Sequence, residues 1–174
     1  KLIVQLAREK IPNWKRPAKW GTGPIFILVC ARTGKHIENS IAPKILSYLD
    51  PMEHKTPVRS GMALQHIELT NGNRIIFQSL ENPTTARERV QSYTAHCVWI
   101  DEQPPTMSLL AELLMRVQAD GGYFLATFTP LTTNAALKKL VETAALPYSK
   151  QYKLRTLDNP LFQGAEERKS LLAS

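Results

Sequence analysis

Two adjacent carboxylates, Asp101 and Glu102, stand where a short apolar segment ends. Residues 97–100 are rich in β-branched and aromatic side chains, which is typical of a buried strand in a parallel sheet. Pro104 and Pro105 prevent that strand from continuing. In open α/β sheets, chemistry takes place just beyond the carboxyl ends of the strands. One acid placed there can hold the water shell of Mg²⁺, and a second can orient and deprotonate an attacking water.

The same two acids also fit a purely structural role, in which a strand ends in an exposed acidic turn. Adjacent residues of an extended strand point to opposite sides, so Asp101 and Glu102 are expected to serve different partners. A second polar strand end, Thr127–Pro130, follows the next predicted strand. If the two strands are neighbours, its threonines lie within reach of the acids. Short hydroxyls in that place can sense a γ-phosphate and pass its loss to the rest of the domain.

Composition favours a single globular domain with a polyanionic partner. The chain has 174 residues, 43% of them hydrophobic, and a net charge of +7 from 22 Lys and Arg against 15 Asp and Glu. No apolar stretch is long enough to span a bilayer, so we expect no membrane partner. Cys30 and Cys97 fall in apolar strand candidates and are expected to be reduced core residues. The chain does not begin with Met and opens within a helical pattern, which suggests a fragment.

Helical and strand patterns alternate along the chain. Predicted helices occupy residues 1–10, 37–49, 106–117 and a segment after Asn134, and predicted strands occupy 25–31, 97–101, 123–128 and 151–154. Between them, residues 66–69 and 74–78 alternate around Thr70–Asn73, a strong hairpin signal. Residues 50–61 are expected to be irregular. This order predicts an α/β fold with a largely parallel sheet, flanked by helices and carrying an inserted hairpin.

Three connecting segments carry basic residues. The loop Trp14–Gly21 combines basic and aromatic residues that can bind a nucleic-acid backbone, but a solvated linker whose tryptophans cover the core edge is the favoured interpretation. The segment Glu81–Tyr93 has no clean period and is expected to be a loop, mobile or simply solvated. A third segment, Thr33–Lys35, is not a phosphate-binding loop, because Val29 and His36 stand where that pattern needs Gly and Ser or Thr. It can still offer Lys35 to an anion.

Three segments together resemble the ATPase domain of the large terminase subunit of tailed bacteriophages, the motor that packages viral DNA into a prohead. They are the hairpin His66–Phe77, the segment Val98–Pro105 (VWIDEQPP) and the segment Thr127–Leu131 (TFTPL). In the second segment, Gln103 replaces an acid of the family's Walker B pattern. Asp158-Asn159-Pro160 also resembles a triplet near the end of such domains. The resemblance implies a P-loop NTPase-like fold of the ASCE type.

By this resemblance, Asp101 organises Mg²⁺ through water and Glu102 is the catalytic base for hydrolysis of ATP. Thr127 and Thr129 belong to the nucleotide site. Coupling of hydrolysis to DNA movement falls to Thr127, Phe128, Thr129 and Pro130.

Family members form a ring on the portal, and an arginine from one subunit can complete a neighbour's site. Arg89, with Arg87 second, is the candidate for that role. Implied partners are double-stranded DNA, the portal protein, the small terminase subunit and further copies of the chain, in the host cytoplasm at the prohead portal. Candidate contacts to the DNA backbone are Lys15, Arg16, Lys19, Lys138 and Lys139.

The sequence departs from the family in lacking the Walker A loop, which is expected before the first helix, and the nuclease domain. We therefore expect residues 1–174 to be a single ATPase domain, a fragment without the upstream Walker A segment or the downstream nuclease, and inactive alone. Two other functions stay open. One is a helicase-like ATPase with the same sheet. The other is a non-catalytic basic module that binds DNA or a partner ring, which the missing Walker A loop favours.

Overall fold

The computed structural model describes residues 1–61, 63–118 and 121–129, together with residues 135, 138, 139, 142 and 152. The chain divides into two units, Lys1–Leu137 and Lys138–Ser174. In the second unit, the side chains of Lys138, Lys139 and Glu142 are exposed. All the helices and strands given below belong to the first unit.

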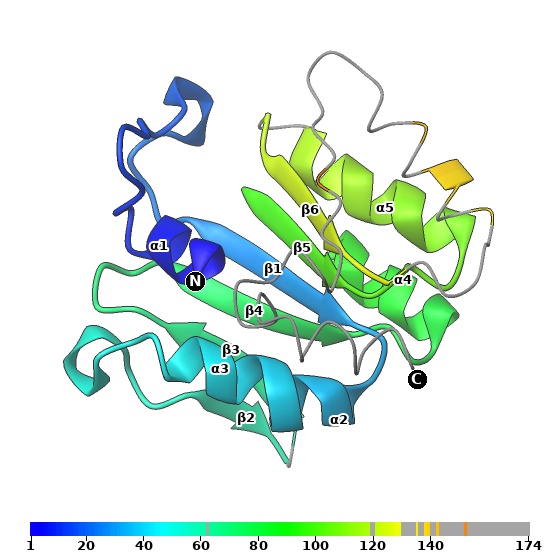
Figure 1. The fold of residues 1–174 in the computed structure, drawn as a ribbon, viewed down its shortest axis with the longest axis horizontal. Coiled ribbons are helices and arrows are strands. Elements are labelled where there is room, and N and C mark those ends of the chain that lie inside the picture. The colour runs from blue at the N-terminus through cyan, green and yellow to red at the C-terminus, as the bar shows by residue number, and fades with distance from the viewer. Residues whose placement is uncertain are drawn as a thin grey trace, which may run out of the picture. The chain divides into compact units, whose positions relative to one another are not determined.

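A six-stranded sheet forms the centre of the first unit, in the order β2-β3-β4-β1-β5-β6 (Figure 1). The strands are β1 (Phe26–Ala31), β2 (Val58–Ser60), β3 (Ala63–Glu68), β4 (Arg74–Ser79), β5 (Cys97–Asp101) and β6 (Tyr123–Thr127). The four strands β4, β1, β5 and β6 are parallel, whereas β2 and β3 are antiparallel additions at one side. The predicted α/β class, the mostly parallel sheet and the inserted hairpin are confirmed.

Helices cover both faces of the sheet (Figure 1). They are α1 (Leu2–Ala7), α2 (Gly34–His36), a π-helical turn η2 (Ile37–Ile41), α3 (Ala42–Leu46), α4 (Pro83–Gln91) and α5 (Met107–Gln118), with 3₁₀ turns η1 (Ala18–Trp20) and η3 (Pro51–Glu53). One apolar cluster joins the sheet to α1, η2 and α3, and a second joins it to α4 and α5. The sheet is therefore the middle layer of three.

The sequence of strand β1 is apolar without interruption because the strand is covered on both faces. Ile27, Val29 and Ala31 belong to the cluster with α1 and α3, whereas Leu28 and Cys30 belong to the cluster with α4 and α5. All five are fully buried. A strand covered on both faces needs apolar residues at every position, as parallel strands usually do. Cys30, like Cys97, is a free buried thiol, as predicted.

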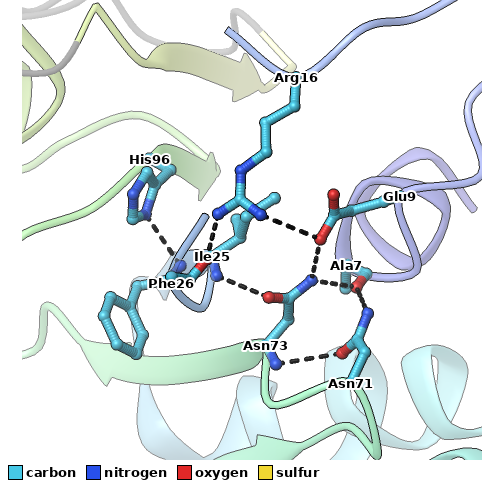
Figure 2. A network of polar contacts seen from close by, with 9 residues as sticks. Ala7, Glu9, Arg16, Ile25, Phe26, Asn71, Asn73 and His96 are labelled. Atoms are coloured by element: carbon cyan, nitrogen blue, oxygen red, sulfur yellow. Dashed lines mark hydrogen bonds and ion pairs between the residues drawn. The ribbon is translucent and has the colours of Figure 1, made fainter. Parts of the chain in front are cut away.

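The turn of the β3–β4 hairpin is tied to the first helix by asparagines. Gly72 has φ +84°, a left-handed conformation that glycine adopts without strain. Asn73, only 1% exposed, accepts a hydrogen bond from the backbone N–H of Ile25 and donates to the backbone oxygen of Ala7 (Figure 2). Asn71 donates to the same oxygen. The hairpin motif therefore joins the amino ends of β1 and β4 to the end of α1.

Three sequence predictions about elements were wrong. The segment predicted as a loop at 81–93 contains helix α4, which Asn82 caps by accepting from Thr85 N–H and which begins with Pro83. Only Ala86 and Val90 of α4 are buried, so its periodicity is too weak to recognise. Residues 50–61 contain η3 and β2, and all three residues of β2 are exposed. Strand β6, predicted as buried, has no buried residue.

Predictions for the segments beyond residue 129 lie outside the described residues. This applies to the helix after Asn134, the strand at 151–154 and the triplet at 158–160.

Candidate functional site

The carboxyl ends of three parallel strands bring Asp101 and Thr127 together. In the sheet register, Asp101 of β5 lies opposite Ala31 of β1 on one side and Thr127 of β6 on the other. The Thr127 hydroxyl donates a hydrogen bond to Asp101 Oδ1 at 2.7 Å. The condition set by the sequence analysis is therefore met, because β5 and β6 are neighbours and Thr127 reaches the first acid.

The second oxygen of Asp101 is held by a residue that sequence reasoning missed. His36 Nε2 lies 2.9 Å from Asp101 Oδ2, and the two side chains are 33% and 27% exposed. Because an ionised carboxylate only accepts hydrogen bonds, Nε2 carries the proton of this pair. Thr33 positions His36, since its hydroxyl accepts from the His36 backbone N–H at 3.2 Å. The turn after β1 therefore fixes the direction of the Asp101 carboxylate.

Besides its bond to Asp101, the hydroxyl of Thr127 has a second partner, Trp99, which orients it. The Trp99 indole Nε1 donates to Thr127 Oγ1 at 2.8 Å, and Thr127 in turn donates to Asp101. Trp99 stands two residues before Asp101 on β5, and therefore on the same face of the strand. This period of two is the signal from which its role could have been found in the sequence. For His36 the only such signal is its place just after the end of a buried strand.

Glu102 leaves the strand geometry that the sequence led us to expect. Its φ is +72°, in the left-handed region that side chains other than glycine rarely adopt. Its backbone N–H donates to the backbone oxygen of Thr127 at 2.7 Å, which holds the turn in place. The prediction that the two acids alternate across an extended strand is thus wrong in its geometry. The two acids nevertheless have different surroundings, because the exposed Glu102 carboxylate, unlike that of Asp101, has no hydrogen bond or ion pair within the described part of the chain.

The remaining residues of the predicted coupling segment show fewer contacts. Phe128 is half-buried and Thr129 is exposed. Among the residues that the structure describes, the Thr129 side chain has no hydrogen bond, so it does not touch the acids as Thr127 does. Pro130 lies outside the described residues. The role of this segment stays a prediction.

The two candidate arginines, both on α4, have different surroundings. Arg87 Nε lies 3.7 Å from Glu112 of α5, which is 5% exposed and also pairs with Arg116 at 2.8 Å. Arg87 therefore takes part in the contact between α4 and α5. Arg89 is exposed and lines a groove beside the ends of β1 and β4. Neither arginine contacts Asp101 or Glu102 within the described residues.

The loop that carries the predicted DNA-contact residues of the first unit lies beside the amino ends of β1 and β6, away from the strand ends that carry the acids. Arg16 pairs with Glu9 at 3.5 Å and donates to the backbone oxygen of Gly23, so its charge serves the network in Figure 2. Lys15 and Lys19 are exposed. In the same loop, Trp20 is 5% exposed, which agrees with tryptophans covering the core edge. The roles of this loop and of Lys138 and Lys139 in binding DNA stay predictions.

Among the described residues, no helix is long and apolar enough to cross a membrane, and no group of three or more His, Cys, Asp or Glu is arranged to hold a metal ion. The Asp101 carboxylate lies between His36 and Thr127. Mg²⁺ suits such a site, because it keeps most of its waters and commonly takes one or two carboxylates together with substrate phosphates.

The fold and site together define an α/β protein whose candidate chemistry lies at the carboxyl edge of a mostly parallel sheet. No protein-family model and no curated protein matches the sequence. Among solved structures, the chain is similar to the large terminase from a thermophilic bacteriophage, with 17% identity, a TM-score of 0.49 and coverage of 65% of this chain and 29% of that one. The same terminase in complex with ADP gives 16% identity, a TM-score of 0.45 and coverage of 63% and 28%.

Proposed function

We propose that this chain is the ATP-hydrolysing part of a viral DNA-packaging motor, a large terminase subunit that moves double-stranded DNA into a prohead. The observation that carries the proposal is the arrangement of Asp101, Glu102 and Thr127 at two adjacent strand ends. One acid is held by two hydrogen bonds, the next is turned out of the strand with its carboxylate free within the described residues, and a hydroxyl links the first acid to the neighbouring strand.

The division of work between the acids follows from these contacts. Asp101 uses one lone pair on each oxygen for Thr127 and His36, and a carboxylate has about four such sites. It can therefore still accept from the waters around Mg²⁺, which when bound neutralises charge on the phosphates. Glu102 is exposed and can orient an attacking water and take its proton.

Coupling is proposed to begin at Thr127. Its hydroxyl touches Asp101 and Trp99, and its backbone oxygen accepts from Glu102 N–H. A change in charge beside the acids therefore reaches the end of β6 through two hydrogen bonds, one from Asp101 and one from Glu102. Phe128, Thr129 and Pro130 continue that strand end, and the proposal includes them in the coupling segment. In the assembled motor, the proposed partners are DNA, portal, small terminase subunit and a ring of copies in the host cytoplasm.

The test is Mg²⁺-dependent hydrolysis of ATP by the longer protein that the resemblance predicts, containing this chain and a segment upstream of Lys1. Glu102→Gln keeps the size of the side chain but removes the base, so we expect kcat to fall by roughly 10²–10⁴-fold. Glu88→Gln, at an exposed position on α4, is the matched control and should keep full activity.

Full activity in Glu102→Gln would refute the assignment of the base. A longer protein that neither binds nor hydrolyses ATP would favour the non-catalytic DNA-binding or assembly module instead.

A further inference from the structure

A groove of about 1030 Å³ opens at the carboxyl ends of β1 and β4. Its walls are the turn from β1 into α2, the tip of the β2–β3 hairpin and one side of α4. Three parts of the chain that are far apart in sequence thus meet around it. None of Asp101, Glu102 and Thr127 lines the groove, so it is separate from the candidate site.

Cationic side chains exceed anionic ones in this groove. Lys35, Arg59 and Arg89 line it, and the acid among the lining residues is Glu38. Glu38 is already used, because one oxygen pairs with Arg59 at 2.9 Å and the other accepts from Leu64 N–H at 2.5 Å. Arg59 and Glu38 largely cancel. The charges of Lys35 and Arg89 remain, and within the described residues neither side chain has a hydrogen bond or ion pair.

The rest of the lining suits a chain of phosphates better than a single small anion. Ser60, Gln65 and Ser79 offer neutral hydrogen-bonding groups, which commonly contact phosphate and sugar oxygens. Tyr93 is half-buried among the lining residues and packs against the apolar cluster of α4 and α5, so it contributes a firm wall to the groove. The volume is at the upper end of the roughly 300–1,000 Å³ of small-molecule sites, and the groove is open to solvent rather than enclosed.

We propose that this groove binds the phosphodiester backbone of a nucleic acid, with Lys35 and Arg89 each neutralising a phosphate. The net charge of +7 favours a long polyanion such as a nucleic acid over a small acidic patch on the surface of another protein. The choice of nucleic acid as the polyanion rests on the proposed function. The groove itself does not, because its shape and charge are independent of ATP hydrolysis.

The groove also has a direct structural link to the candidate site. Lys35 lines the groove, and the next residue, His36, holds Asp101 at 2.9 Å. Both side chains stand on the same turn after β1. A backbone phosphate bound by Lys35 therefore contacts the same turn that orients the Asp101 carboxylate.

The test is binding of fluorescently labelled DNA, single-stranded and duplex, to the full chain without nucleotide. Each cation on a phosphate contributes about 0.7 to the salt slope for single strands and about 0.9 for B-DNA. The double variant Lys35→Gln/Arg89→Gln should therefore lower the slope by about 1.4 or 1.8. At about 0.1 M salt, this corresponds to roughly 25-fold weaker binding of the single strand and roughly 60-fold weaker binding of the duplex. The form of DNA whose measured loss reaches the value expected for that form is the one that the groove accepts.

The matched control is Lys10→Gln/Lys44→Gln, which removes the same charge at exposed positions outside the groove. Unchanged or nearly unchanged binding by this control supports the groove. Equal losses in both double variants would mean that only net charge matters, and would overturn the proposal. Undiminished DNA binding by the groove variant would also overturn the proposal. So would a loss of DNA binding that occurs only in Lys15→Gln/Lys19→Gln.

Folding of each variant is checked by thermal melting, and no change is expected for the groove variant, because neither the Lys35 nor the Arg89 side chain has a hydrogen bond or ion pair in the described residues. Failure of the groove is distinguishable from failure of the proposed ATPase. DNA binding is measured without ATP, whereas the ATPase is judged by Glu102→Gln in the hydrolysis assay.

Discussion

Replacing Asn73 by alanine tests whether the hairpin motif is structural. Asn73 Oδ1 accepts from Ile25 N–H at 2.6 Å, and Nδ2 donates to Ala7 O at 2.9 Å and to Glu9 Oε1 at 3.0 Å. The side chain thus joins the start of β1, the end of α1 and the turn before β4 (Figure 2). Both Asn73 and Ile25 are essentially inaccessible to water.

The expected loss follows from what each partner can do without Asn73. The buried N–H of Ile25 is left without an acceptor, which costs about 1–3 kcal/mol. The oxygen of Ala7 keeps its bond from Asn71, at 3.0 Å, so its loss is small. Glu9 is partly exposed and regains water in place of a bond that contributes about 1 kcal/mol. We therefore expect Asn73→Ala to lower the free energy of unfolding by about 3 kcal/mol, or Tm by roughly 6–12 °C.

Urea denaturation of the full chain measures this loss, and Asn71→Ala provides the matched control. Asn71 has the same side chain and shares the acceptor Ala7 O, but it is exposed, so water replaces its hydrogen bonds. Its replacement should cost less than about 1 kcal/mol. Equal losses in the two variants, or a loss below about 1 kcal/mol for Asn73→Ala, would refute the argument that the buried N–H of Ile25 decides the effect.

Two further predictions concern the candidate site and the core. Thr127→Val removes the acceptor of Trp99 Nε1 and should shift the indole N–H resonance of Trp99 in NMR spectra. Thr127→Ser keeps the hydroxyl and should preserve the position of that resonance. An unmoved Trp99 resonance in the valine variant would contradict the hydrogen-bond chain. Burial raises the pKa of the Cys97 thiol to about 12 and also raises that of Cys30, so the native protein should resist alkylation by iodoacetamide near pH 8. Because these thiols ionise near 8.5 only after unfolding, stability should fall as pH rises above that value, and rapid labelling of the folded chain would show the expectation to be wrong.

Local sequence patterns were sufficient for much of the sheet. The apolar run of β1 and the Asn-Gly turn of the hairpin each reflect a rule that acts over a few residues: burial on both faces in the first case, and a glycine at positive φ in the second. The break after Asp101 was predicted from two prolines. Helix α4 escaped prediction because its two buried residues, Ala86 and Val90, leave almost no periodic signal.

The candidate site was predicted in part. Asp101, Glu102 and Thr127 stand at strand ends, and the positions of strand ends can be inferred from sequence. His36 and Trp99 were missed, because a hydrogen bond depends on register between strands, and register is fixed by pairing across the sheet. The left-handed turn at Glu102 likewise depends on its N–H meeting the Thr127 oxygen from the neighbouring strand.

The sequence by itself therefore determined where most strands of the mostly parallel sheet lie, and that the acids fall where one of them ends. Only the tertiary structure decided what surrounds those acids and where Lys35 and Arg89 converge on one groove. The physical reason is the separation along the chain over which each effect acts. Burial and turn preferences act between residues close in the chain, whereas the groove and the contacts of Asp101 arise from residues dozens of positions apart, brought together when the sheet forms.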